Sequence, residues 1–133
     1  MLAGLYPVTL FTASILGILI VMISFKCAMR RLNEKIEIGI GQDPKLERLM
    51  RAQANLTEYT PISIILIGLL EANGTNIQIL YTLAGVLIVA RLMHAYGFVT
   101  TPGKNPGRFY GTSLTWLTIL VACVLGLMTV FGL

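Results

Sequence analysis

Charged residues are scarce in this chain. Only 12% of its 133 residues are Asp, Glu, Lys or Arg, about half the usual share in a soluble domain, while 56% are hydrophobic. The mean hydropathy is +0.80. A soluble protein of this length has too little interior to bury so many apolar side chains. The composition therefore excludes an ordinary soluble domain and predicts a protein that lies in a lipid bilayer.

Cysteine and histidine are also rare. The chain has two cysteines, Cys27 and Cys123, and one histidine, His94. The cysteines have no redox or metal-ligand spacing, and a single histidine with no cysteine beside it does not make a metal site. No Ser-His-Asp arrangement, phosphate-binding glycine loop or carboxylate pair is visible. We therefore expect no disulfide framework and no bound metal, and hydrolytic and nucleotide chemistry have no support.

Long uncharged runs predict four helices, over about residues 3–35, 44–72, 76–98 and 109–132. Residues 1–25 contain no charge, and about 20 apolar residues suffice to cross a membrane. Asp43 followed by Pro44 predicts the start of the second helix, and Pro61 predicts a kink within it. The expected fold is all-α, an integral membrane four-helix bundle, with residues 1–133 forming one domain.

The basic residues indicate an orientation in the membrane. Seven of the ten Lys and Arg residues lie between Lys26 and Arg51, Lys104 and Arg108 flank the third connection, and the opposite side of the predicted bundle has none. Basic connections mark the cytoplasmic side. We therefore expect both termini outside the cytoplasm, and we interpret the basic excess as a topology signal and not as a nucleic-acid surface.

A group of polar residues falls within or close to the predicted membrane region. Its members are Arg51, Asn55, Glu58, Tyr59, Arg91 and His94. The first three are spaced i, i+4 and i+7 on the second helix and share one face. The last two are spaced i, i+3 near the cytoplasmic end of the third helix. Because these helices are antiparallel, the two sets can form one polar site that opens to the cytoplasm.

Two interpretations of this group remain open from the residues alone. Arginine forks match carboxylates and Glu58 can accept from an ammonium, so the group suits a zwitterionic peptide with free carboxylates. Alternatively, Glu58 and Arg91 form a structural ion pair. In that case Asn55 bonds a neighbouring helix and Arg51 reaches lipid phosphate. Glu71, at the outer end of the second helix, is expected to face solvent without a role.

Two segments carry a family resemblance. Residues 51–61, RAQANLTEYTP, resemble the signature of the MAPEG family, the membrane-associated proteins in eicosanoid and glutathione metabolism. Residues 91–98, RLMHAYGF, resemble the family's third-helix motif in the form found in bacterial members. The resemblance extends over essentially the whole chain. It implies a homotrimer in a bacterial inner membrane, with glutathione bound between neighbouring subunits near the cytoplasmic face.

The resemblance also implies roles for individual residues. The implied glutathione-binding residues are Arg30, Arg31, Arg51, Gln53, Asn55, Glu58, Tyr59, Arg91 and His94. Arg108 is similar in place to the arginine that stabilises the glutathione thiolate, and it is the one implied catalytic residue. The sequence departs from the family pattern at Phe98, where the family has a tyrosine, and in the spacing of the Pro-Gly-rich connection that follows.

The implied function is that of a membrane glutathione transferase. It would conjugate glutathione, its co-substrate, to hydrophobic electrophiles that enter from the bilayer, with glutathione peroxidase activity as a further expectation and no metal. The alternative is a non-catalytic membrane binding or scaffold protein of the same fold. For Arg108 the corresponding alternative is an anchor at the lipid headgroups, because basic residues routinely flank spanning helices.

Overall fold

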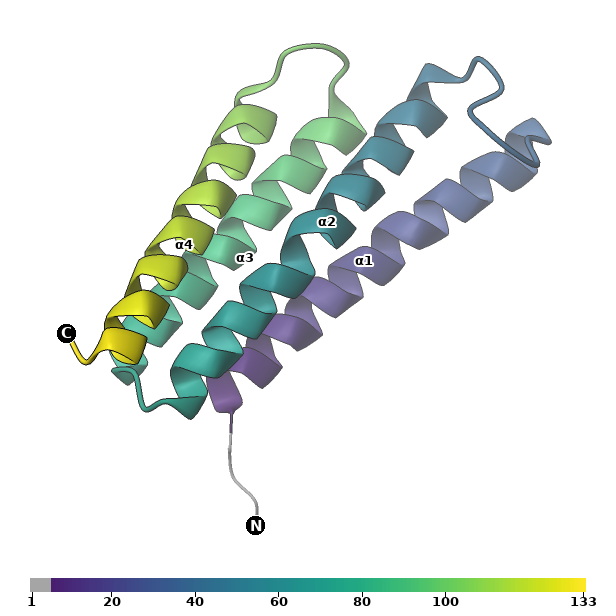
Figure 1. Cartoon of the computed structure of the whole chain (residues 1–133). Coiled ribbons are helices and arrows are strands. Elements are labelled where there is room, and N and C mark those ends of the chain that lie inside the picture. Colours follow the sequence, from purple (N-terminus) through teal and green to yellow (C-terminus); the bar gives the residue numbers. More distant parts are fainter. Residues whose placement is uncertain (1–5) are drawn as a thin grey trace.

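The computed structural model describes residues 6–133, which form four α-helices that run side by side (Figure 1). The helices are α1 (Pro7–Glu34), α2 (Pro44–Ala72), α3 (Ile77–Thr100) and α4 (Pro106–Phe131). The α1–α2 and α3–α4 connections lie at one end of the bundle, and the C-terminus and the start of α1 lie at the other (Figure 1). The all-α prediction is confirmed. Residues 3–5 of the predicted first helix lie outside the described part.

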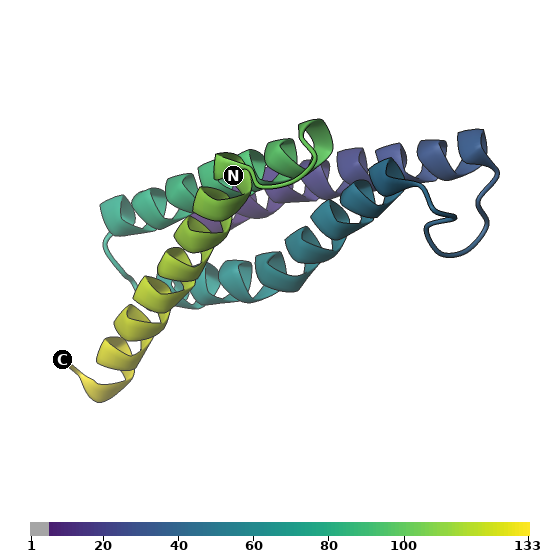
Figure 2. The same ribbon diagram turned by 90° about the horizontal axis from the view of Figure 1, so that it is seen from above.

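α2 begins at the predicted residue. The Asp43 carboxylate accepts a hydrogen bond from the backbone N–H of Lys45, and Pro44 occupies the first helical position, where its missing N–H costs nothing. The helix continues through Pro61. Figure 2 shows that it changes direction along its length, as the proline predicts.

α4 begins three residues earlier than the sequence prediction. The side chain of Asn105 accepts from the N–H of Gly107, and Pro106 takes the first position of the helix, so α4 starts there and not at Phe109. An Asn-Pro pair is as good a helix start as the Asp-Pro pair of α2, so the sequence contains a local signal for a start at Pro106. Arg108 therefore lies inside the first turn of α4 and not before it.

The start of α1 is capped by a residue of another helix. Glu71, near the end of α2, accepts hydrogen bonds from the N–H groups of Val8 and Thr9 at 3.0 and 2.8 Å. It also accepts one from the Thr9 hydroxyl at 2.6 Å. The first N–H groups of a helix lack intrahelical partners, and a carboxylate is favourable at that positive end. The prediction that Glu71 has no role was therefore wrong, because it joins the two helices.

The helices enclose two apolar clusters. One lies toward the termini and includes Leu16, Ile67 and Leu87, and the other lies toward the α1–α2 connection and includes Ile23 and Leu56. α4 packs against α3 and α2, while α1 packs against α2 and α3. Figure 2 shows the C-terminal end of α4 directed away from the other helices. Among the described residues, α3 and α4 share the most extensive contact of any two helices. This contact positions the site described below.

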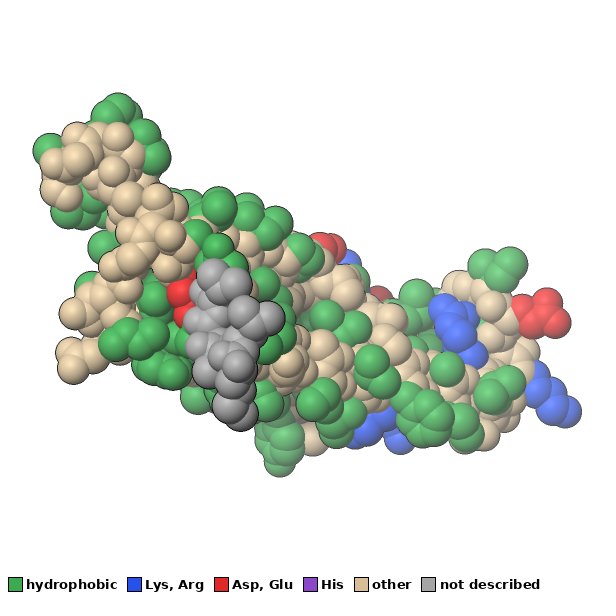
Figure 3. Space-filling model, turned by 90° about the horizontal axis from the view of Figure 1, so that it is seen from below, with side chains coloured by type: hydrophobic (Ala, Val, Ile, Leu, Met, Phe, Trp, Pro, Cys, Tyr) green, Lys and Arg blue, Asp and Glu red, His purple; other side chains and the backbone are tan. Residues whose placement is uncertain are grey.

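The outer surface is largely apolar. Large hydrophobic side chains such as Phe11, Val21 and Leu120 are more than half exposed. In Figure 3 hydrophobic side chains are spread along the whole face, whereas its Lys and Arg side chains lie in the half toward the α1–α2 connection. α1, α3 and α4 are long and apolar enough to cross a membrane. The first half of α2 is charged, so only its later part is apolar. This surface requires a bilayer.

Candidate functional site

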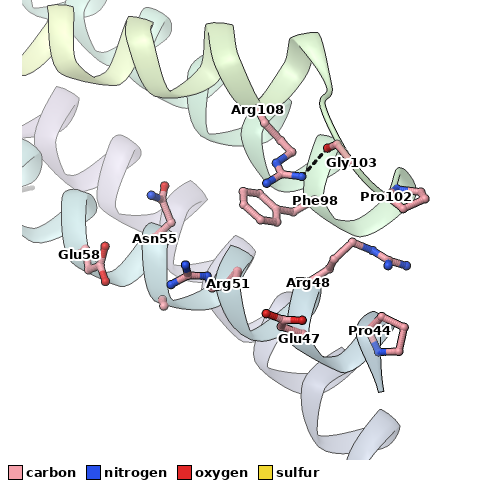
Figure 4. Close-up of a pocket in the computed structure, with 11 residues that line it drawn as sticks. Pro44, Glu47, Arg48, Arg51, Asn55, Glu58, Phe98, Pro102, Gly103 and Arg108 are labelled. Carbon is pink, nitrogen blue, oxygen red and sulfur yellow. Dashed lines mark hydrogen bonds between the residues drawn. The ribbon is translucent and has the colours of Figure 1, made fainter. Parts of the chain in front are cut away.

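A polar cavity of about 550 Å³ opens between the first half of α2 and the α3–α4 connection. This volume lies in the usual range for small-molecule sites, about 300 to 1,000 Å³. In Figure 4 the α2 side chains line one side, and Phe98, Gly103 and Arg108 line the other. The lining residues are Pro44, Glu47, Arg48, Arg51, Ala54, Asn55, Glu58, Phe98, Pro102, Gly103 and Arg108.

Helical spacing creates the α2 side of the cavity. Steps of three or four residues lead from Arg51 to Asn55 and on to Glu58, so these predicted residues share one face, as expected. The sequence reasoning missed Glu47 and Arg48, which line the same side. Three- and four-residue steps back from Arg51 reach both, so the helical period could have found them. This side presents two arginines and two glutamates.

On the other side of the cavity, Arg108 is held by two contacts. Its Nη1 donates a hydrogen bond to the carbonyl oxygen of Gly103 at 2.6 Å, drawn in Figure 4. Its Cζ lies 3.8 Å from the centroid of the Phe98 ring, a cation–π contact. Phe98 lacks the hydroxyl of the tyrosine expected there, but its ring fixes the guanidinium. The positive charge is therefore confined to one place at the rim of the cavity.

Close packing of α3 and α4 brings Arg108 to that place. A Cβ added to Gly111 would lie 2.6 Å from the carbonyl oxygen of Ala90 and 2.8 Å from the backbone nitrogen of His94. A Cβ on Gly97 would lie 3.0 Å from the backbone nitrogen of Arg108. The distances at Gly111 leave no room for a side chain, and at Gly97 an added Cβ would force the start of α4 to shift. Glycine at both positions lets the start of α4 lie directly against α3.

Arg91 and His94 lie behind the cavity and not in it. Arg91 is 0% exposed, and its Nη2 donates to Asn55 Oδ1 at 2.7 Å and contacts His94 Nδ1 at 3.3 Å. Its Nη1 donates to the Thr115 hydroxyl at 3.4 Å. Among residues 6–133 Glu58 forms no ion pair with Arg91, so that part of the structural interpretation is wrong, whereas its expectation that Asn55 bonds a neighbouring helix is confirmed. The α2 and α3 motifs do meet, through Asn55.

The two α1 arginines contact other residues of the same chain. Arg30 forms a forked pair with Asp43, at 2.7 and 3.3 Å, and an ion pair with Glu34 at 2.8 Å. The Arg30 guanidinium holds the pKa of the Asp43 carboxyl below its usual range. Nη2 of Arg31 lies 3.1 Å from the sulfur of Met50. Neither arginine lines the cavity, so their binding of glutathione stays a prediction.

Gln53 and Tyr59 also lie outside the cavity lining. Gln53 Nε2 donates to the Ser24 hydroxyl on α1 at 2.9 Å. The Tyr59 ring meets the Trp116 ring of α4 edge-on, with 6.5 Å between centroids. In one chain, then, the predicted residues that line the cavity are Arg51, Asn55, Glu58 and Arg108. The binding roles of Gln53 and Tyr59 stay predictions.

The fold and the site together define an integral membrane four-helix protein with a ligand-sized polar cavity near one end of the bundle. The MAPEG family model matches residues 9–128. The chain is also 31% identical, over 105 residues that cover 79% of each chain, to "Inner membrane protein YecN" of Escherichia coli K12 and equally to its counterpart in Escherichia coli O6:H1. The chain belongs to the MAPEG family.

Proposed function

We propose that this protein is a membrane glutathione transferase. Its substrates are hydrophobic electrophiles that reach the site from the bilayer, and lipid hydroperoxides are a second class that the same thiolate could reduce. The observation that carries the proposal is one cavity that brings together Arg51, Asn55 and Glu58 of α2 with a fixed Arg108 of α4. Membership of the MAPEG family supports it.

The charges of the cavity complement those of glutathione. The cavity is lined by three arginines and two glutamates, whereas glutathione carries two carboxylates, one ammonium and a thiol. We assign Arg51 to a carboxylate, because a guanidinium fork pairs with both carboxylate oxygens. We assign Glu58 to the ammonium group. Both side chains are exposed within one cavity, so a bound peptide can reach both.

Thiolate formation is the chemical task of the site. A free thiol with a pKa near 8.5 is only a few per cent ionised at pH 7, and lowering that pKa by about 2 requires about 2.7 kcal/mol of differential stabilisation. A preorganised guanidinium that donates to the thiolate can supply energy of this order. The thiol proton passes to solvent, the thiolate attacks the electrophilic carbon, a C–S bond forms, and the leaving group departs with its electron pair.

We further propose a homotrimer in a bacterial inner membrane, with both termini outside the cytoplasm. The relative YecN is an inner membrane protein by name. The trimer accounts for Arg30 and Arg31, which would act at the cavity of a neighbouring subunit. Native mass spectrometry in detergent should then detect three copies, and a purely monomeric spectrum would contradict this assembly.

The function is tested with the purified protein in detergent micelles. Glutathione should raise the melting temperature, and the protein should conjugate glutathione to a nitroaryl chloride faster than buffer does. Arg51→Ala should weaken glutathione binding by about 1.5 to 3 kcal/mol, the usual value of a hydrogen bond to a charged group. Lys45→Ala, an exposed position on the same helix outside the cavity lining, is the control and should bind normally.

Two other outcomes would contradict the proposal. A thermal shift without conjugation would identify a glutathione-binding protein with no transferase activity. No thermal shift at any glutathione concentration would leave the polar group with a structural role only.

A further inference from the structure

Arg91 is a buried cation surrounded by neutral partners. It is completely inaccessible in α3, and its contacts are the Asn55 amide, the His94 ring and the Thr115 hydroxyl. Among residues 6–133 no carboxylate pairs with it. A buried guanidinium is costly unless its N–H groups find acceptors. The 2.7 Å contact with Asn55 is the shortest of the three, so it contributes most to satisfying the charge.

The chemistry of arginine determines which way the Asn55 amide faces. A guanidinium has only donors and no acceptor, so the Asn55 atom that it contacts must be the carbonyl oxygen Oδ1. The NH₂ group at Nδ2 must then face the other way. Asn55 lines the cavity, and within the described residues Nδ2 has no hydrogen-bond partner and is not sealed from solvent. The free edge of the amide therefore consists of two N–H donors.

We propose that Arg91 is a positioning residue that fixes Asn55 as a donor toward the cavity. The ligand atom at Asn55 must then be an acceptor, a carbonyl or carboxylate oxygen, and a ligand with an amine at this place is rejected. Arg91 itself does not touch the ligand. This assignment rests on the proposed function, because it takes glutathione as the ligand. It adds that Asn55 is the donor, and the ligand the acceptor, in the hydrogen bond between them.

Asn55→Asp is the decisive variant because it replaces only the amide nitrogen by oxygen. Toward Arg91 the new carboxylate forms a charge-assisted pair, so the melting temperature without ligand should stay the same or rise. Toward the cavity it offers an acceptor and a negative charge, so the glutathione dissociation constant, measured by isothermal titration calorimetry, should increase at least ten-fold. If Asn55 had only a structural role, Asn55→Asp, which keeps its melting temperature, would bind glutathione as tightly as the unmodified protein.

Variants of Arg91 test the positioning role itself. Arg91→Met frees the amide to turn and should weaken glutathione binding several-fold. Arg91→Lys, which also donates only, should restore most of the binding. Thr115→Val removes a different hydrogen-bond partner of the buried Arg91 guanidinium and leaves the contact with Asn55 in place. This variant should therefore bind glutathione as tightly as the unmodified protein.

The outcomes separate this inference from the proposed function. If the unmodified protein does not bind glutathione, both are overturned. If it binds and Asn55→Asp binds equally well, the donor assignment alone is overturned. Equal glutathione binding by Arg91→Met and Arg91→Lys would overturn the positioning role. If Arg91→Met fails to fold, the comparison of Asn55→Asp with the unmodified protein still tests whether Asn55 acts as a donor.

Discussion

Arg108 combines three features that favour a nearby anion. Its guanidinium remains charged at every relevant pH, Phe98 and the Gly103 carbonyl confine it, and it lies in the first turn of a helix, where unpaired N–H groups add positive charge. His94 is buried behind the cavity and does not line it, so it cannot meet a thiolate bound there. Arg108 is thus the better candidate for stabilising a thiolate.

Replacing Arg108 by alanine should separate binding from thiol activation. Glutathione should still bind, through the α2 residues, but the pKa of its thiol should rise toward about 8.5, the value of a free thiol. Ultraviolet absorbance of the thiolate, titrated with glutathione bound, measures this pKa. His94→Ala should move it much less.

Lys104→Ala is the matched control for a role of Arg108 as a membrane anchor. Lys104 is an exposed basic residue of the same connection and does not line the cavity. Its removal should leave the thiol pKa unchanged. An Arg108→Ala variant that titrates like the unmodified protein would establish the anchor interpretation instead.

Among the elements, the α1–α2 connection depends on an ion pair that responds to pH. Asp43 both caps α2 and pairs with Arg30, and that pair lowers the pKa of the Asp43 carboxyl in the folded protein. A lowered pKa contributes stability that is complete above the unfolded value of about 3.9 and is lost as the pH falls through the folded value. Acid should therefore weaken this connection.

Asp43→Asn tests this pH dependence, since asparagine keeps the capping oxygen and removes the charge. The variant should melt at a lower temperature than the unmodified protein at pH 7, and the difference should shrink as the pH falls below about 4. Thermal unfolding from pH 7 to about pH 2 measures it. Glu34→Gln, which removes the other partner of Arg30, should preserve the trend. A difference that stays constant over this range would show that the ion pair contributes nothing.

The crossing of α3 and α4 depends on glycine. Gly111→Ala should lower the stability by about 1 to 3 kcal/mol, the usual cost of overpacking, because the new Cβ would meet backbone atoms of Ala90 and His94 that cannot move aside. The displaced α4 should also reduce conjugation by moving Arg108. Gly126→Ala, on the same helix with open space around the added Cβ, should show neither loss. Identical melting temperatures for the two variants would refute the packing argument.

For the whole molecule, the helices and the charges together predict the orientation. Four helices place the end of α4 on the same side as the start of α1, and the basic residues gather at the opposite end. A tag after Leu133 should be cleaved by protease added to intact spheroplasts. The same tag inserted between Ile38 and Gly39 should be protected. Protection of the first tag and cleavage of the second would reverse the orientation.

The sequence by itself determined the class of molecule and most of the α2 side of the site. Hydropathy and proline-linked caps are local properties, so the bilayer, the four helices and the start of α2 could be predicted. The face shared by Arg51, Asn55 and Glu58 follows from the helical period alone. Even the true start of α4, at Pro106, had a local signal in Asn105.

Only the tertiary structure decided which polar groups meet. The N–H groups at the start of α1 are satisfied by Glu71, more than 60 residues away, and Arg91 finds Asn55 on another helix, 36 residues away, and not Glu58. Helical spacing specifies a face, but it does not specify which face of a neighbour lies opposite. That choice depends on how the helices cross, and here the close contact at Gly111 sets the crossing of α3 and α4 and so brings Arg108 to the cavity.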